Sequence, residues 1–372
     1  MKGTKRIIIA VLLSLLSVLL IAVIVFACSY ASRIRTMTTI EKVTNYSDGY
    51  NLYRMNVKYD YDLDEIINYG CENDQDFADA IVKEALPGLP VSIEVPNFGC
   101  SAFTLKADDG DVMMGRNYDF RYNTSAMLVF CTPKDGYKSV AFAALDNVKA
   151  NDADGSIRSR LTCLTAPFVC LDGMNEKGVS IAVLTLDSKP TRQDTGKPNI
   201  STSMAIRLVL DRAATTEEAV QLLKQYDMMA TAGRDYHFYI TDACGDGRVV
   251  EWDCESDSRE LVDTPTRTVT NFFIIHKDKV TNKKDKNGIY GHGLDRYEDI
   301  EGVFNAASKK DGSVAWQALM KASQDPGGDV TSNTQWSIVF NNTDLSLEFV
   351  LHKDWENVLN YDLNTNTVDA SE

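Results

Sequence analysis

The sequence predicts an α+β fold with antiparallel sheets, and two observations carry this prediction. Strand-like segments come in two blocks, before and after a pair of amphipathic helices, which is an order typical of α+β domains. Most consecutive strands are joined by short turns, which antiparallel pairing allows and parallel pairing does not. Apolar residues make up 44% of the 372 residues, so the chain has enough of them for a full hydrophobic core.

The first strand block begins at Cys100. Residues 101–107 and 111–120 are strand-like, and the Asp109-Gly110 pair between them is typical of a hairpin turn. Further strands are expected at 127–132, 139–145 and 178–186, with a turn at 172–178 before the last of them.

Two helices separate the strand blocks. Residues 203–214 are amphipathic, and Thr215 with Glu218 forms a capping-box pattern that opens the second helix. The second block has expected strands at 236–243, 247–252 and 266–275, then a helix near 314–323 and a hairpin of 334–340 with 346–351.

The N-terminus carries a long apolar run. Residues 7–27 follow Lys2, Lys5 and Arg6, and the run is long enough to cross a bilayer and longer than the apolar part of most cleaved signals. We therefore expect residues 1–28 to form a signal anchor, with the rest of the chain outside the cytoplasmic membrane. Ala27-Cys28 also resembles a lipoprotein cleavage site, so lipidation of Cys28 stays an alternative.

The net charge of the chain and the spacing of its cysteines and histidines argue against some functions. The formal net charge of −15 argues against a nucleic-acid partner, because phosphate backbones are bound through clustered Lys and Arg. The eight cysteines and four histidines form no CxxC or HxxxH pair, so the spacing predicts no metal and no other cofactor. Disulfides are possible outside the cytoplasm, but their pairing is not readable from sequence.

Cys100 has three alternative roles: a packed thiol, half of a disulfide, or a nucleophile. If the chain is cut between Gly99 and Cys100, the α-amino group of Cys100 becomes free, and such a group has a pKa near 7.7–8.0, well placed for a general base. No histidine is then needed. Gly99 lacks a Cβ, so its peptide can adopt the strained geometry in which a thiol attacks the preceding carbonyl.

Two charged residues are expected beside Cys100. The hairpin at Asp109-Gly110 folds Arg116 and Asp119 back toward it. A neighbouring Arg lowers a thiol pKa, and a carboxylate orients and holds an α-ammonium group. Taken alone, the pair also fits a surface ion pair.

The stretch "GCSAFTLKADDGDVMMGRNYDF" resembles the nucleophile segment of the choloylglycine hydrolase family of N-terminal-nucleophile hydrolases. In that family Arg and Asp follow the nucleophilic Cys by sixteen and nineteen positions, as Arg116 and Asp119 follow Cys100 here. The resemblance implies a four-layer αββα sandwich over 100–372. It also implies that 29–99 is a propeptide or a small N-terminal subunit, as in the lysosomal amidases of the family.

The resemblance implies three more site residues. Residues 172–186 resemble the second motif of the family, with Thr185 at the place of an asparagine whose backbone N–H faces the oxyanion. "VTNFF" resembles the family's "TN" strand and implies that Asn271 donates its amide N–H there, and "GHGLDRYED" aligns Arg296 with the last catalytic arginine. We interpret Asn175 as a turn former.

The implied function is hydrolysis of a linear amide C–N bond in a small N-acyl compound, such as a bile-acid conjugate, penicillin V or an N-acyl amino acid. Two alternatives stay open: an acyltransferase of the isopenicillin-N type, and a membrane-tethered binding protein with the same fold. The sequence leaves a homo-oligomer open.

Overall fold

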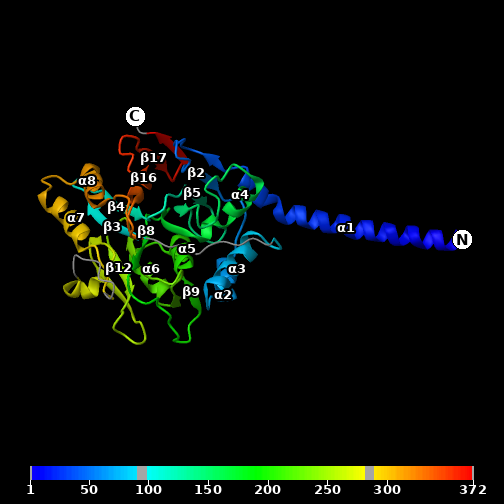
Figure 1. The fold of residues 1–372 in the computed structure, drawn as a ribbon, viewed down its shortest axis with the longest axis horizontal. Coiled ribbons are helices and arrows are strands. Elements are labelled where there is room, and N and C mark those ends of the chain that lie inside the picture. Colours follow the sequence, from blue (N-terminus) through cyan, green and yellow to red (C-terminus); the bar gives the residue numbers. More distant parts are fainter. Residues whose placement is uncertain (1, 90–98, 281–288, 371–372) are drawn as a thin grey trace.

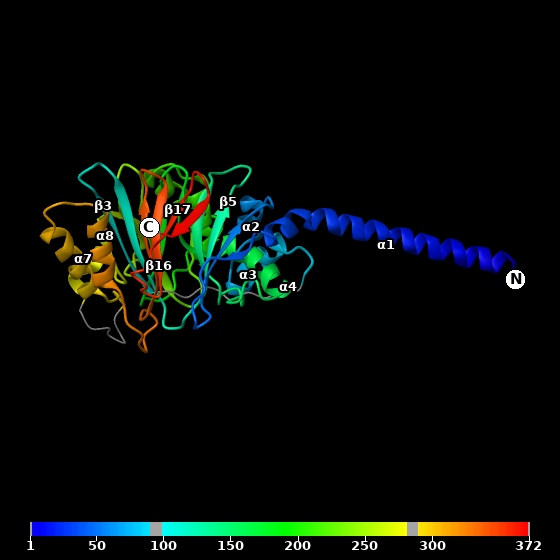
Figure 2. The same cartoon turned by 90° about the horizontal axis from the view of Figure 1, so that it is seen from above.

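Two β-sheets stack face to face, and helices cover both outer faces (Figures 1 and 2). The computed structural model describes residues 2–89, 99–280 and 289–370. In chain order these residues follow the expected pattern of strands, two helices and strands again. The α+β prediction and the four-layer αββα arrangement are therefore confirmed.

The first sheet has seven strands in the order β14-β3-β4-β15-β16-β17-β18. Both predicted hairpins, β3–β4 and β15–β16, are present and antiparallel. Helices α7 (Leu294–Ala306) and α8 (Gly312–Ala322) cover the outer face. The strands are β3 (Gly99–Lys106), β4 (Val112–Asp119), β14 (Thr268–Val269), β15 (Thr334–Asn341), β16 (Ser346–Leu351), β17 (Leu359–Asp362) and β18 (Thr367–Ala370).

The second sheet has nine strands in the order β1-β2-β5-β6-β7-β8-β11-β12-β13. The strands are β1 (Glu41–Lys42), β2 (Leu52–Asn56), β5 (Ala126–Cys131), β6 (Ser139–Ala144), β7 (Cys170–Asn175), β8 (Ser180–Leu186), β11 (Asp235–Thr241), β12 (Arg248–Trp252) and β13 (Leu261–Pro265). A separate two-stranded sheet pairs β9 (Asn199–Ser201) with β10 (Asp227–Met229).

Helix α5 (Thr202–Arg212) packs on β7 and β8, and α6 (Thr216–Leu223) follows it directly. The capping prediction is confirmed at its first bond, because Thr215 Oγ1 accepts the Glu218 N–H at 3.1 Å, whereas the Glu218 carboxylate accepts the N–H of Ala214, one residue before the cap, at 2.7 Å. The same side carries α2 (Leu63–Tyr69), α3 (Asp74–Ala85), α4 (Ile157–Thr162) and the 3₁₀ helix η1 (Cys163–Phe168).

The sheets are mainly antiparallel, as predicted, and two strand pairs among the described residues are parallel. These are β2 with β5 and β9 with β10. A parallel pair needs a long crossover connection, and the residues between β2 and β5 supply one that holds α2, α3 and the β3–β4 hairpin. Strands β1 and β2, which lie in the segment 29–99, therefore belong to the nine-stranded sheet together with strands that follow Cys100.

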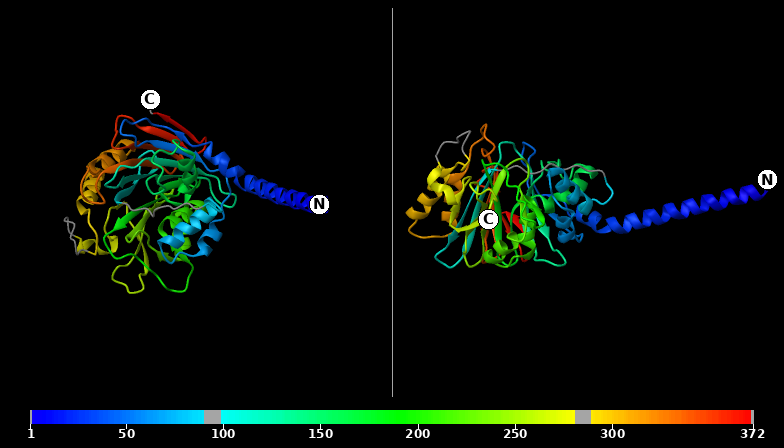
Figure 3. Two further views of the ribbon diagram at one scale, coloured as in Figure 1. Left: turned by 45° about the vertical axis from the view of Figure 1, so that its right-hand side comes forward. Right: turned by 90° about the horizontal axis from the view of Figure 1, so that it is seen from below.

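The N-terminal helix α1 (Lys2–Met37) extends away from the sandwich (Figure 3). Its segment Val11–Cys28 has a mean hydropathy of 3.1, and its length and composition fit a membrane anchor and a signal sequence alike. The helix does not end at this segment. The Tyr30 hydroxyl donates to the Pro87 carbonyl at 2.7 Å, and the Arg33 guanidinium donates to the carbonyls that end α3.

Two local expectations are wrong. The segment 266–275 is a strand only at β14, and a 3₁₀ helix, η2 (Ile274–Lys279), begins inside it. The cause is the buried Glu251, whose carboxylate accepts the N–H groups of Ile274 and Ile275 at 3.0 and 2.9 Å and turns the backbone. The expected turn at 172–178 is strand β7 up to Asn175, and only its end turns.

We expect Met55→Asp to destabilise the whole fold. The Met55 side chain is fully buried in β2, so the substitution places an unpaired carboxylate in the core and lowers the free energy of unfolding by at least about 3 kcal/mol. Asn56→Asp is the matched control, because Asn56 is partly exposed on the same strand. Urea unfolding measures both variants. A Met55→Asp protein as stable as the control would contradict the place of β2 in the sheet.

Candidate active site

Cys100 is the second residue of β3 and is fully buried. The register places it opposite Tyr118 and places Gly99 opposite Asp119. Side chains alternate between the faces of a strand, so Cys100 and Arg116 share one face while Asp119 lies on the other. The hairpin thus brings all three predicted residues together, with the thiol between the sheets and the carboxylate beside the backbone of Cys100.

The thiol is protonated near neutral pH in the uncut chain. Burial raises the pKa of Cys100 to about 12, and the positive charge of Arg116 works against this rise. The negative charge of Asp119 adds to it.

Arg116 is buried between two sheets and paired with Asp172 of β7. Its Nε donates to Asp172 Oδ2 at 3.1 Å and its Nη1 donates to the Asn117 carbonyl at 2.6 Å. Asp172 Oδ2 also accepts from Trp336 Nε1 at 3.1 Å. The Arg116 Nη2 atom has no hydrogen-bond partner among the described residues. Asp172 is thus the counter-ion of Arg116.

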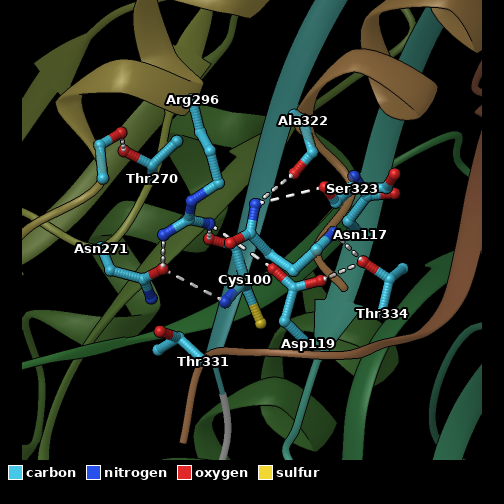
Figure 4. A network of polar contacts seen from close by, with 12 residues as sticks. Cys100, Asn117, Asp119, Thr270, Asn271, Arg296, Ala322, Ser323, Thr331 and Thr334 are labelled. Atoms are coloured by element: carbon cyan, nitrogen blue, oxygen red, sulfur yellow. Dashed lines mark hydrogen bonds and ion pairs between the residues drawn. The ribbon is translucent and has the colours of Figure 1, made fainter. Parts of the chain in front are cut away.

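Asn271 connects Cys100 to Arg296 (Figure 4) and also to Thr185. Its Oδ1 accepts the Cys100 backbone N–H at 3.3 Å and Arg296 Nη2 at 2.7 Å. Its Nδ2 donates to the Thr185 carbonyl at 2.8 Å. An amide nitrogen carries two hydrogens, so one N–H of Asn271 remains beyond the Thr185 bond. One of the two N–H groups of the Asn271 amide is therefore already used, and its carbonyl oxygen faces the backbone nitrogen of Cys100.

Arg296 lies in the first turn of α7 and reaches the start of β3 and the end of β4. Its Nη1 donates to the Cys100 carbonyl at 2.9 Å and lies 3.5 Å from Asp119 Oδ2. Asp119 Oδ1 accepts from Thr334 Oγ1 at 2.7 Å. Burial raises the pKa of Asp119, while Arg296 and the Thr334 hydroxyl lower it in part. Arg296 is buried rather than a surface arginine of the helix.

A second polar network borders Asn271. The His292 N–H donates to the Asn271 carbonyl at 2.8 Å, which fixes the backbone that carries the amide. His292 Nδ1 lies 2.7 Å from Asp187 Oδ2, and its Nε2 lies 3.0 Å from the Thr331 hydroxyl. Figure 4 shows Thr331 on the same side of Cys100 as the sulfur.

Contacts link five of the six candidate residues, and Arg116 shares the face of the sheet that carries the Cys100 side chain, whereas Asn175 lies outside this group. Asn175 ends β7, where its Oδ1 accepts the N–H groups of Lys177 and Val179 and its Nδ2 donates to two carbonyls at the C-terminal end of α5. Its interpretation as a turn former is confirmed. Asp172, His292 and Thr334 were not singled out from the sequence. Asp172 is nevertheless the first residue of the motif 172–186, and His292 lies in the "GHGLDRYED" stretch.

The four-layer sandwich, with a cysteine near the start of an inner strand, defines the class of N-terminal-nucleophile-hydrolase-like proteins. A family model described as linear amide C-N hydrolases, choloylglycine hydrolase family, matches residues 100–286. The chain belongs to this family, whose general activity is amide hydrolysis.

Two solved structures show the shared fold. Penicillin V acylase from Agrobacterium tumefaciens is 18% identical with a TM-score of 0.50, and the match covers 71% of this chain and 86% of that one. A conjugated bile acid hydrolase from Clostridium perfringens is 15% identical with a TM-score of 0.52, covering 73% of this chain and 96% of that one. No curated protein matches the sequence.

Proposed function

We propose that this protein hydrolyses the linear amide bond of a small N-acyl compound, with Cys100 as an N-terminal nucleophile released by cleavage after Gly99. One observation carries the proposal. The backbone nitrogen and carbonyl of Cys100 are held by Asn271 and Arg296, while its side chain lies on the face of the sheet that also carries Arg116 of β4. A purely structural thiol needs none of these contacts.

The new α-amino group is the base in this proposal. In the uncut chain the Cys100 nitrogen is an amide that donates to Asn271 Oδ1. Cleavage turns it into an amine at the same place, where Asn271 Oδ1 accepts one of its hydrogens and Asp119, opposite Gly99, offsets the charge of the ammonium form. An amine poised near neutral pH then takes the thiol proton and gives it to the leaving amine.

Two donors are available for the oxyanion. One is the second N–H of Asn271 Nδ2. The other is the backbone N–H of Thr185. In an antiparallel pair a residue exchanges both of its backbone bonds with the partner or neither, so its N–H and C=O point to one side. The Thr185 carbonyl meets Asn271, so we assign its N–H to that side as well. Such a donor is worth about 3–4 kcal/mol in a transition state.

The bond changes follow from these positions. The Cys100 thiolate attacks the amide carbonyl, the C–N bond breaks, and the protonated amine leaves. Water, deprotonated by the α-amino group, then attacks the thioester, which releases the acid and restores the thiol. The positive charge of Arg116, whose Nη2 atom has no hydrogen-bond partner among the described residues, favours the thiolate form of Cys100.

The N-terminal piece is proposed to stay bound after cleavage. Strand β2 pairs with β5 inside the nine-stranded sheet, and Arg160 donates to the carbonyls of Met37 and Ile40 at 2.9 and 3.1 Å. With an uncleaved signal anchor, the catalytic part then works outside the membrane.

Intact-mass analysis of the purified protein tests this function. We expect two chains, one beginning at Cys100, that elute together in size exclusion and release free amine from N-acyl compounds. The assay panel holds a bile-acid conjugate, penicillin V and N-acyl amino acids. An active protein with an unbroken chain would contradict the N-terminal-nucleophile mechanism, and a cut protein that releases no amine would contradict hydrolysis.

A further inference from the structure

A second cluster of reactive side chains lies outside the proposed active site. The ligand atoms of Asp253, Cys254 and His276 all lie within 4.8 Å of one another. Asp253 and Cys254 follow β12 directly, and His276 lies within η2. Cys254 and His276 are twenty-two positions apart in the sequence, so short spacing rules do not find them.

The backbone on both sides of the cluster is fixed. The Asp253 N–H donates to the Glu260 carbonyl at 2.9 Å, and the His276 N–H donates to the Phe273 carbonyl at 3.1 Å. His276 Nε2 lies 2.8 Å from Asp253 Oδ1, which also accepts the Glu255 N–H at 2.9 Å. Asp253 Oδ2 is the carboxylate oxygen left for a further ligand. His276 is buried, whereas Asp253 and Cys254 are partly exposed, so the cluster is open to solvent on one side.

We propose that Asp253, Cys254 and His276 bind a divalent metal ion of the zinc type. Thiolate, imidazole and carboxylate together suit Zn²⁺, whereas Mg²⁺ and Ca²⁺ prefer sites built from oxygen alone. Three protein ligands leave a fourth position for water. Binding forms a metal–sulfur bond and releases the thiol proton of Cys254 to solvent, so the affinity rises with pH.

The neighbouring carboxylate of Glu255 is held by groups outside the cluster. Glu255 is engaged by Lys279 Nζ and by the Tyr290 hydroxyl, both at 2.6 Å, so it does not compete for His276.

The ion would join two elements next to the proposed active site. η2 begins at Ile274, three residues after Asn271, and β12 already holds its first turn through Glu251. A metal bridge from the end of β12 to His276 would fix the same segment a second time. The inference does not depend on the proposed hydrolysis, because it concerns metal binding alone.

Cobalt titration of the full-length protein in detergent tests the site. Co²⁺ bound to a thiolate gives a sulfur-to-metal charge-transfer band in the near ultraviolet, which bonding to imidazole and carboxylate alone does not give. We expect this band in the native protein and its loss in Cys254→Ser. Cys244→Ser is the matched control, because Cys244 is an exposed cysteine in the hairpin between β11 and β12.

Zinc competition against a chromogenic chelator supplies the second measurement. Cys254→Ser and His276→Gln should each weaken Zn²⁺ binding at least about 10-fold, and Cys244→Ser should leave it unchanged. The proposal is overturned if the folded native protein gives no charge-transfer band, or if the band survives in Cys254→Ser. Circular dichroism of each variant shows that it is folded.

Discussion

Cys100→Ala is expected to leave the chain uncut and to reduce amide hydrolysis by at least about 10³-fold, because both reactions need the same sulfur. The substitution removes one buried atom from a site held by backbone contacts with Asn271 and Arg296, which alanine retains. We therefore expect a folded protein of nearly unchanged stability. Intact mass, thermal melting and amine release measure the three quantities.

Cys100→Ser is a second informative variant at this position. A hydroxyl is a weaker nucleophile than a thiolate but occupies the same place, so slow or partial cleavage with little turnover is expected. Cys131→Ser is the matched control at another buried cysteine on a neighbouring sheet. Full activity in folded Cys100→Ala would show that the reaction uses another residue.

Arg116→Met is expected to lower the free energy of unfolding by about 3–5 kcal/mol, because it leaves the Asp172 carboxylate buried without its cation. Methionine fills much the same length, so the effect reports the charge rather than a cavity. Urea unfolding at neutral pH measures the loss.

The pH dependence of this variant has a definite sign. Burial raises the pKa of Asp172 and the charge of Arg116 lowers it, so removing Arg116 raises the pKa of Asp172 in the folded protein further. A folded-state pKa above the unfolded value stabilises the fold at low pH, and this contribution is lost as pH rises through the folded pKa. The deficit of Arg116→Met should therefore shrink on acidification from neutral pH.

Two comparisons separate charge from packing. The double variant Arg116→Met/Asp172→Asn should recover part of the lost stability, since no buried charge remains unpaired. Asp172→Asn alone leaves the buried guanidinium without a counter-ion, so it is also destabilising. A double variant less stable than both single variants would mean that the pair is not the dominant interaction of Arg116.

The fold class and the proximity of the candidate residues could be predicted from sequence for different reasons. The hairpin register is set by turn residues and alternation, so Cys100, Arg116 and Asp119 had to meet once the turn at Asp109-Gly110 was recognised. Asn271 and Arg296 came from family resemblance, because no local rule brings residues so distant in sequence together.

What the sequence missed depends on contacts between sheets and on single long-range bonds. Asp172 becomes the partner of Arg116 only when the two sheets stack. β2 was not predicted as a strand of the main sheet, because its partner β5 is far away in sequence and parallel. The end of the expected strand at 266–275 depended on Glu251, a residue of another element.

The parallel pairing of β2 with β5 bears on how long the enzyme would last if it is cut as proposed. After that cleavage no covalent bond would join β5 to the chain that carries α1, so the attachment of the two chains would depend on their dissociation rate. Loss of the smaller chain would bare the apolar β5 as an open sheet edge, where unpaired backbone groups recruit other strands. Dissociation of the smaller chain would thus lead directly to aggregation, and the aggregated catalytic chain would not rebind the chain that carries α1.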